Sequence, residues 1–99
     1  MSLFNIIKTL GRPVAYGYHT TRQEPPYFCI TGEGQDHFDA DNTYYITKNR
    51  YQVEYYFRKK NEAFEAEIEA LLLSTGHHYE KSDDIYIDDE DVFLIYYDI

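Results

Sequence analysis

Hydrophobic and polar residues alternate along the chain between residues 50 and 58. The apolar positions of this stretch are Tyr51, Val53, Tyr55 and Phe57, and the polar positions are Arg50, Gln52, Glu54 and Arg58. Successive side chains of a β-strand point to opposite faces, so the apolar set shares one face and the polar set shares the other. The alternation therefore predicts a strand with a core face and a solvated face, apart from Tyr56.

The first residues of the chain show the spacing of a short amphipathic helix instead. The apolar positions are Leu3, Phe4, Ile6, Ile7 and Leu10. They recur at the three- and four-residue intervals of one helix face. Ser2 can cap the amino end and Gly11 can stop the helix, so we expect a helix between these two residues.

A second helix is predicted from about residue 61 to residue 75. Asn61 is a good N-cap and Gly76 is a natural stop. The apolar positions of this helix are Phe64, Ile68, Leu71 and Leu72. Glu62, Glu65 and Glu69 occupy the opposite side, where we expect them to face solvent, and Glu62 and Glu65 place negative charge near the positive end of the helix.

The remaining segments predict short strands and polar turns. Strands are expected at residues 14–18, 27–31, 44–47, 77–80, 85–87 and 92–98, and turns or loops at residues 19–26, 35–43, 82–84 and 88–91. We expect Gly32 and Gly34 to end the strand at 27–31. This order predicts one α+β domain over residues 1–99, with helices packed on one face of an antiparallel or mixed sheet.

Tyrosine is unusually frequent, since the chain has 12 Tyr and 6 Phe and no Trp. The pairs Tyr44–Tyr45, Tyr55–Tyr56 and Tyr96–Tyr97 put one ring on each face of the sheet. One helix layer covers one face only. The rings on the other face therefore predict either a protein partner or a cover formed by the second helix.

The charge of the chain is strongly negative and unevenly placed. The net charge is −9, which disfavours nonspecific binding to nucleic acid and to anionic lipid. Residues 1–60 carry eight bases and six acids, whereas residues 61–99 carry one base, Lys81, and twelve acids. This division fits a solvated acidic face, or a self-complementary oligomer in which the basic region of one copy meets the acidic region of the next.

Several other classes of site find little support in the sequence. No apolar run is long enough to span a membrane, and the single cysteine, Cys29, excludes an internal disulfide, excludes a cysteine-based zinc site and fits a reducing cytoplasm. Cys29 lies in an apolar strand, where burial would leave it inert. The Gly32-Glu33-Gly34 segment lacks the lysine and the following helix of a phosphate loop. We therefore expect no enzyme and no cofactor.

An acidic cluster raises the question of a metal site. The cluster consists of Asp36, His37, Asp39, Asp41 and Asn42. Its spacing does not fit a calcium loop, because Tyr44 and Arg50 fall where the glycine and the bidentate glutamate should be. Adjacent His77 and His78 would point to opposite strand faces and cannot easily chelate one ion. A turn explains the cluster equally well.

Scattered motifs along the chain resemble a family of phage proteins. These motifs are Pro26-Tyr27, Gly34-Gln35-Asp36-His37-Phe38, Ala40-Asp41-Asn42, Tyr51-Gln52-Val53-Glu54-Tyr55, Lys59-Lys60-Asn61, His78-Tyr79-Glu80 and the strand Phe93 to Tyr97. From about Val14 to Ile99 the chain resembles the small tail-completion proteins of long-tailed siphophages and prophages, also called tail terminators or head-tail joining proteins.

The resemblance implies a non-enzymatic structural protein of the virion tail, assembled in the bacterial host cytoplasm. Such proteins form rings, often hexamers, that cap the tail-tube protein and dock to the head-closure or connector protein. An acidic ring would also repel the DNA that passes through it. The alternative is an acidic DNA-mimic inhibitor or another small phage interaction protein. In the DNA mimic, the glutamates of the second helix and the tract from Asp83 to Asp91 imitate a row of phosphates.

The division of charge suggests which residues would join neighbouring copies. The candidate basic side consists of Arg50, Arg58, Lys59 and Lys60, and the candidate acidic side consists of Glu62, Glu65, Glu69, Asp88, Asp89, Glu90 and Asp91. A head-to-tail interface joins two different patches on each copy, as these two sides would be.

Overall fold

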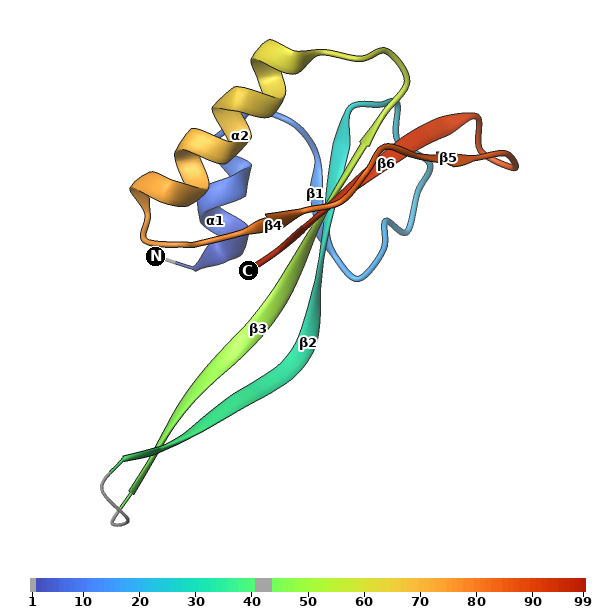
Figure 1. The fold of residues 1–99 in the computed structure, drawn as a ribbon. Coiled ribbons are helices and arrows are strands. Elements are labelled where there is room, and N and C mark those ends of the chain that lie inside the picture. Colours follow the sequence, from blue (N-terminus) through green and yellow to red (C-terminus); the bar gives the residue numbers. More distant parts are fainter. Residues whose placement is uncertain (1, 41–43) are drawn as a thin grey trace.

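The computed structural model describes the backbone of residues 2–40 and 44–99 and the side chains of residues 2–32 and 50–99. The elements follow the order α1 (Leu3–Lys8), β1 (Val14–Tyr16), β2 (Tyr27–Ala40), β3 (Tyr44–Phe57), α2 (Glu62–Ser74), β4 (Glu80–Lys81), β5 (Ile85–Ile87) and β6 (Val92–Asp98) (Figure 1). This confirms the predicted α+β class with an amino-terminal helix and a central helix.

The strands form one mixed sheet. Its order is β1-β2-β3-β6-β4, and β5 pairs with β6 beside β4. Strand β1 runs parallel to β2, whereas the other pairs are antiparallel. Between β4 and β5, Ser82 keeps contact with β6, because its hydroxyl accepts a 2.8 Å hydrogen bond from the Tyr96 amide. Two short strands thus share one edge of β6.

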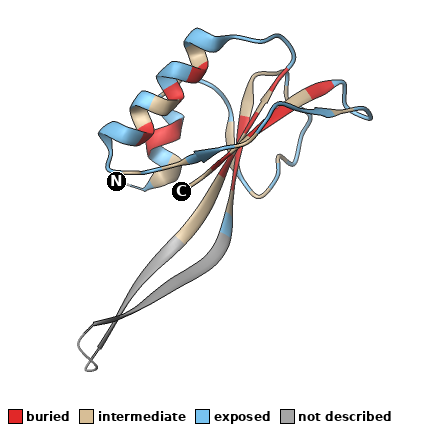
Figure 2. Ribbon diagram, in the orientation of Figure 1, coloured by how far each residue is buried: buried red, intermediate tan, exposed pale blue. Residues whose placement is uncertain are grey.

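Both helices pack on the same face of the sheet. Ile7 of α1 and Ile68 and Leu72 of α2 are fully buried against the apolar face of the strands (Figure 2). The strand residues in this core are Phe28, Ile30, Val53, Tyr55, Phe57, Ile95 and Tyr97. The alternation between residues 50 and 58 therefore predicted the core face of β3 correctly.

Local capping explains where the helices begin and end. The Asn61 side-chain oxygen accepts a 3.0 Å hydrogen bond from the Phe64 amide at the start of α2. At its end Gly76 has a φ of +86°, and the His77 amide donates to the Leu72 carbonyl at 2.9 Å. Glycine adopts this left-handed conformation without steric cost. Ser2 caps α1 in the same way as Asn61 caps α2.

Several predicted strand boundaries are wrong: the strand expected at 14–18 ends at Tyr16, and the strands expected at 44–47 and 50–58 are one strand, β3. Residues 35–40 were expected in a loop, but β2 continues to Ala40, because β3 continues opposite it and pairs with its backbone. The register shifts between Gly32 and Gln35, so the glycines accommodate an irregularity rather than a strand end. The strand expected at 77–80 is reduced to Glu80–Lys81, because the His77 amide closes the preceding helix.

Candidate assembly surfaces

The outer parts of β2 and β3 form a two-stranded arm, defined here as residues 33–40 and 44–50. Inside the body, β2 pairs with β1 as far as Ile30, and β3 pairs with β6 from Gln52 onward. Tyr51 still exchanges two backbone hydrogen bonds with Ile99. In the arm, the described backbone of the two strands pairs from Gln35 opposite Asn49 to Ala40 opposite Tyr44. Figure 1 shows the arm leaving the body, and the molecule measures 50 × 26 × 24 Å.

The arm lacks a third strand among the residues that the structure describes. An isolated two-stranded hairpin is marginally stable in water, and its outer edges present unpaired backbone groups. The outer edges of the arm are therefore open to pairing with another chain.

The predicted basic side lies at the base of the arm and in the loop between β3 and α2. Arg50 stands at the base of the arm and is half-buried. Arg58 contacts Glu24 at 3.5 Å, and its Nε donates to the Asp91 carbonyl at 3.4 Å. Lys59 has no ion-pair partner in the described ranges 2–32 and 50–99.

Glu65 was predicted to face solvent, and this prediction is wrong. Its side chain is buried, with the residue only 2% exposed. Lys60 from the loop before α2 and Lys81 from β4 each approach its carboxylate to 2.9 Å. Two cations that come from different elements therefore compensate the buried charge, which the helical spacing alone could not show.

Glu69 belongs to the same network, one helical turn further along α2. Its carboxylate lies 2.9 Å from the Lys81 ammonium and accepts hydrogen bonds from the hydroxyls of Tyr97 at 2.8 Å and Tyr79 at 3.4 Å. Lys60 also contacts Asp84 at 3.0 Å. We call Lys60, Glu65, Glu69 and Lys81 the α2 charge cluster; it joins the helix to the edge of the sheet.

Mutual contacts shift the pKa values of this cluster. Burial opposes ionisation of Glu69, but hydrogen bonds from Lys81 and Tyr97 outweigh it and lower the pKa of the Glu69 carboxyl. Burial likewise opposes the charged form of Lys81, but Glu69 and Glu65 raise its pKa above the ordinary value. Burial and the bond to Glu69 raise the pKa of Tyr97. Glu69 and Lys81 therefore keep their opposite charges at neutral pH.

The predicted acidic side is divided between two places. Glu62 is exposed at the start of α2, and Asp88, Asp89, Glu90 and Asp91 form the exposed turn between β5 and β6. Asp91 accepts a 2.7 Å hydrogen bond from the Tyr86 hydroxyl. Since Arg58 contacts the Asp91 carbonyl, this turn adjoins the basic loop. The basic and acidic sides are thus neighbours in one copy, and Lys60 and Glu65 pair within it.

The face of the sheet opposite the two helices carries aromatic rings. For these rings the sequence predicted either a protein partner or a cover formed by the second helix. Tyr27 and Tyr56 stack with centroids 4.8 Å apart, and the ring of His19 meets Tyr27 edge-on at 5.3 Å. Residues 17–22 line a cavity of about 260 Å³ over Cys29 and these tyrosines. Burial raises the pKa of the Cys29 thiol to about 11. A loop, and not the second helix, therefore lies over this face.

The described residues show neither a metal-binding cluster nor a membrane-spanning helix. The described residues hold no group of three His, Cys, Asp or Glu side chains able to bind a metal ion. Asp41 and Asn42 of the acidic cluster lie outside them, as do the side chains of Asp36, His37 and Asp39. Within the described chain, no helix is long and apolar enough to cross a membrane.

Comparisons with protein-family models, with curated proteins and with solved structures gave no match. The arm and the charges around it are the features of this chain that bear on its function.

Proposed function

We propose that this protein is a non-enzymatic structural protein that assembles into a ring through its arm and completes a phage tail. In this role it caps the tail-tube protein and docks to the head-closure or connector protein. Its place is the virion tail, assembled in the bacterial host cytoplasm. The resemblance of the sequence to tail-completion proteins supports this role.

The arm is the observation that carries the proposal. Its strands leave the body of their own chain and end in a ladder that has no third strand in the described structure. When the arm of one copy contacts the body of a neighbouring copy, the two surfaces in contact are different parts of the chain. Repetition of such an unlike contact around an axis closes a ring. The arm therefore supports head-to-tail assembly without requiring the predicted pairing of charges between copies.

Deleting the arm tests this proposal. The variant replaces residues 33–50 by Asn-Gly, a turn that closes two-residue hairpins, and so joins Gly32 to Tyr51 through that turn. These two residues are paired in the register, so the body keeps its sheet. We expect the full chain to sediment with assembled tail tubes and the arm-deleted variant to remain in the supernatant.

Circular dichroism of the arm-deleted variant provides the control, since the buried core lies outside the deleted segment. A folded variant that still sediments with the tubes would contradict the role of the arm. If the full chain ignores tail tubes but binds a DNA-handling enzyme, with an affinity that falls steeply with salt, the DNA-mimic alternative replaces tail completion.

A further inference from the structure

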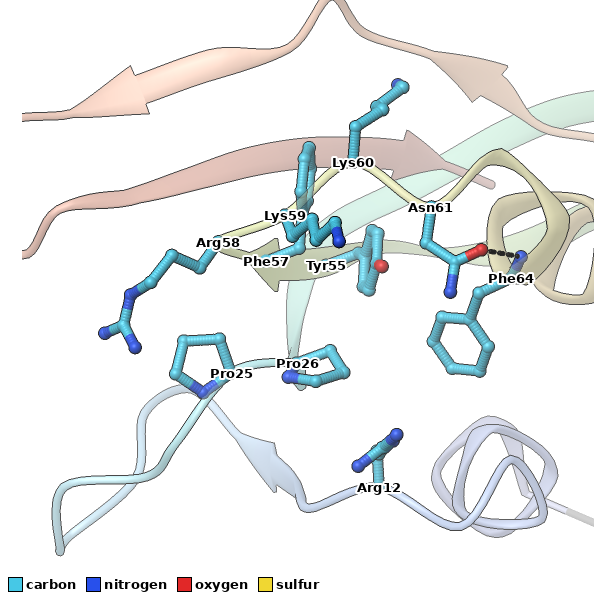
Figure 3. A pocket seen from close by; sticks show the side chains of 10 residues that line it. All are labelled: Arg12, Pro25, Pro26, Tyr55, Phe57, Arg58, Lys59, Lys60, Asn61 and Phe64. Carbon is cyan, nitrogen blue, oxygen red and sulfur yellow. Dashed lines mark hydrogen bonds between the residues drawn. The ribbon is translucent and has the colours of Figure 1, made fainter.

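A cleft of about 450 Å³ lies where the loop between β3 and α2 faces Pro25, Pro26 and Arg12 (Figure 3). Among the described residues that line it, four are basic, namely Arg12, Arg58, Lys59 and Lys60, and there is no Asp or Glu. The chain as a whole has a net charge of −9. This cleft is therefore a local site of positive charge on an acidic protein, and it attracts anions.

Two of the four cations form no ion pair with the described residues outside the cleft. Arg58 contacts Glu24, and Lys60 contacts Glu65 and Asp84, outside the cleft. Arg12 and Lys59 form no ion pair within the described part of the chain. Figure 3 shows Arg12 and Lys59 on opposite sides of the space that these residues line. They come from segments far apart in sequence, and the fold brings their charges to one place.

Two neutral donors complete the arrangement. Tyr55 is 1% exposed, and it lines the cleft. Burial raises the pKa of this phenol to about 12, so it keeps its proton and can donate it in a hydrogen bond. The side-chain oxygen of Asn61 already accepts from the Phe64 amide, which leaves the Asn61 NH₂ group to donate. The donors thus outnumber the acceptors that the cleft itself provides.

We propose that this cleft binds an oxyanion, a carboxylate or a phosphate, carried on an apolar group. Arg12 and Lys59 hold the charge, while the Tyr55 hydroxyl and the Asn61 amide complete the hydrogen bonds. The apolar part of the ligand packs on Pro25, Pro26 and Phe64, which are half-buried at the wall of the cleft. This site does not depend on the proposed tail function.

Chemical-shift titration of the ¹⁵N-labelled full chain tests the site with two probes, phenyl phosphate and 3-phenylpropionate. We expect saturable shifts at Arg12 and at residues 59–61, and no such shifts with the uncharged analogue benzyl alcohol. Tighter binding of phenyl phosphate assigns a phosphorylated ligand, and tighter binding of 3-phenylpropionate assigns a carboxylate. Absence of saturable shifts with both probes overturns the proposal.

Three variants identify the donors. Arg12→Gln and Lys59→Gln should each weaken binding of the better probe about tenfold, since each removes a charge-assisted hydrogen bond. Tyr55→Phe keeps the buried ring and should weaken binding several-fold. Lys8→Gln, which removes an exposed charge on α1, is the matched control and should leave the affinity unchanged. Equal affinity in all four variants would show that the probes bind elsewhere.

Discussion

Glu65 is an acidic side chain that the fold takes out of water. A buried carboxylate remains charged only when nearby cations and hydrogen bonds replace its lost hydration. Lys60 and Lys81 supply that compensation, and their own side chains remain partly exposed, at 41% and 34%. If one lysine is enough to compensate the Glu65 charge, the other can therefore turn to solvent, whereas the buried Glu65 side chain cannot.

Replacing both lysines should cost more than the two single changes together. Lys60→Met or Lys81→Met leaves Glu65 with one cation, but the double variant leaves a buried charge unpaired and should lose about 3 kcal/mol of unfolding free energy. Urea unfolding of the full chain measures this. Lys8→Met, which breaks no ion pair, serves as the control. Strict additivity of the single effects would show that Glu65 does not need the two lysines.

Glu69 gives the cluster a dependence on pH. Its pKa is lowered in the folded state, so the folded protein favours the ionised carboxylate more than the unfolded chain does. The contribution to stability is therefore complete above the ordinary glutamate pKa of 4.5 and is lost as pH falls below it. The unfolding free energy, measured by urea unfolding at neutral and at acidic pH, should fall less on acidification in Glu69→Gln than in the unchanged protein. An unchanged decline would rule out this contribution.

At the scale of elements, the parts of the fold that short-range patterns determine could be predicted. The alternation from Tyr51 to Phe57 and the caps at Asn61 and Gly76 involve residues close in sequence, and they gave the inner part of β3 and the helix α2 correctly. The continuation of β2 to Ala40 depends on β3, and its polar sequence favours a turn when read alone. The burial of Glu65 likewise depends on Lys81, sixteen residues away.

The end of α2 provides a test of local structure. Gly76 has a φ of +86°, and a Cβ there meets no neighbouring atom, so the cost of a side chain is conformational. Gly76→Ala should therefore lower the unfolding free energy by about 1–2 kcal/mol. Gly76→Asn should cost less, because asparagine tolerates the left-handed region. Thermal unfolding of both variants compares them; equal losses would argue against this conformational cause.

At the scale of the whole molecule, the arm and the net charge act in opposite directions. Each copy carries a charge of −9, so copies repel one another, whereas the proposed backbone pairing of the arm with a neighbour joins them. Several of the charges predicted to join copies are already paired inside one chain, as Lys60 is with Glu65. Assembly through the arm must therefore overcome a net repulsion.

Salt should strengthen self-association for this reason. Raising the ionic strength screens the repulsion between copies and leaves backbone pairing of the arm largely unaffected. Sedimentation velocity at low and high sodium chloride, at one protein concentration, should show a larger assembled fraction at high salt. A smaller assembled fraction would instead favour an interface made by the predicted basic and acidic sides.

The mass of the full chain in solution tests the central claim most directly. Light scattering across a concentration series, first alone and then with the tail-tube protein, measures it. We expect a ring-sized species of the 11.8 kDa chain, either alone or once the tube protein is added. A monomer that persists at every concentration and ignores the tube protein would contradict the account.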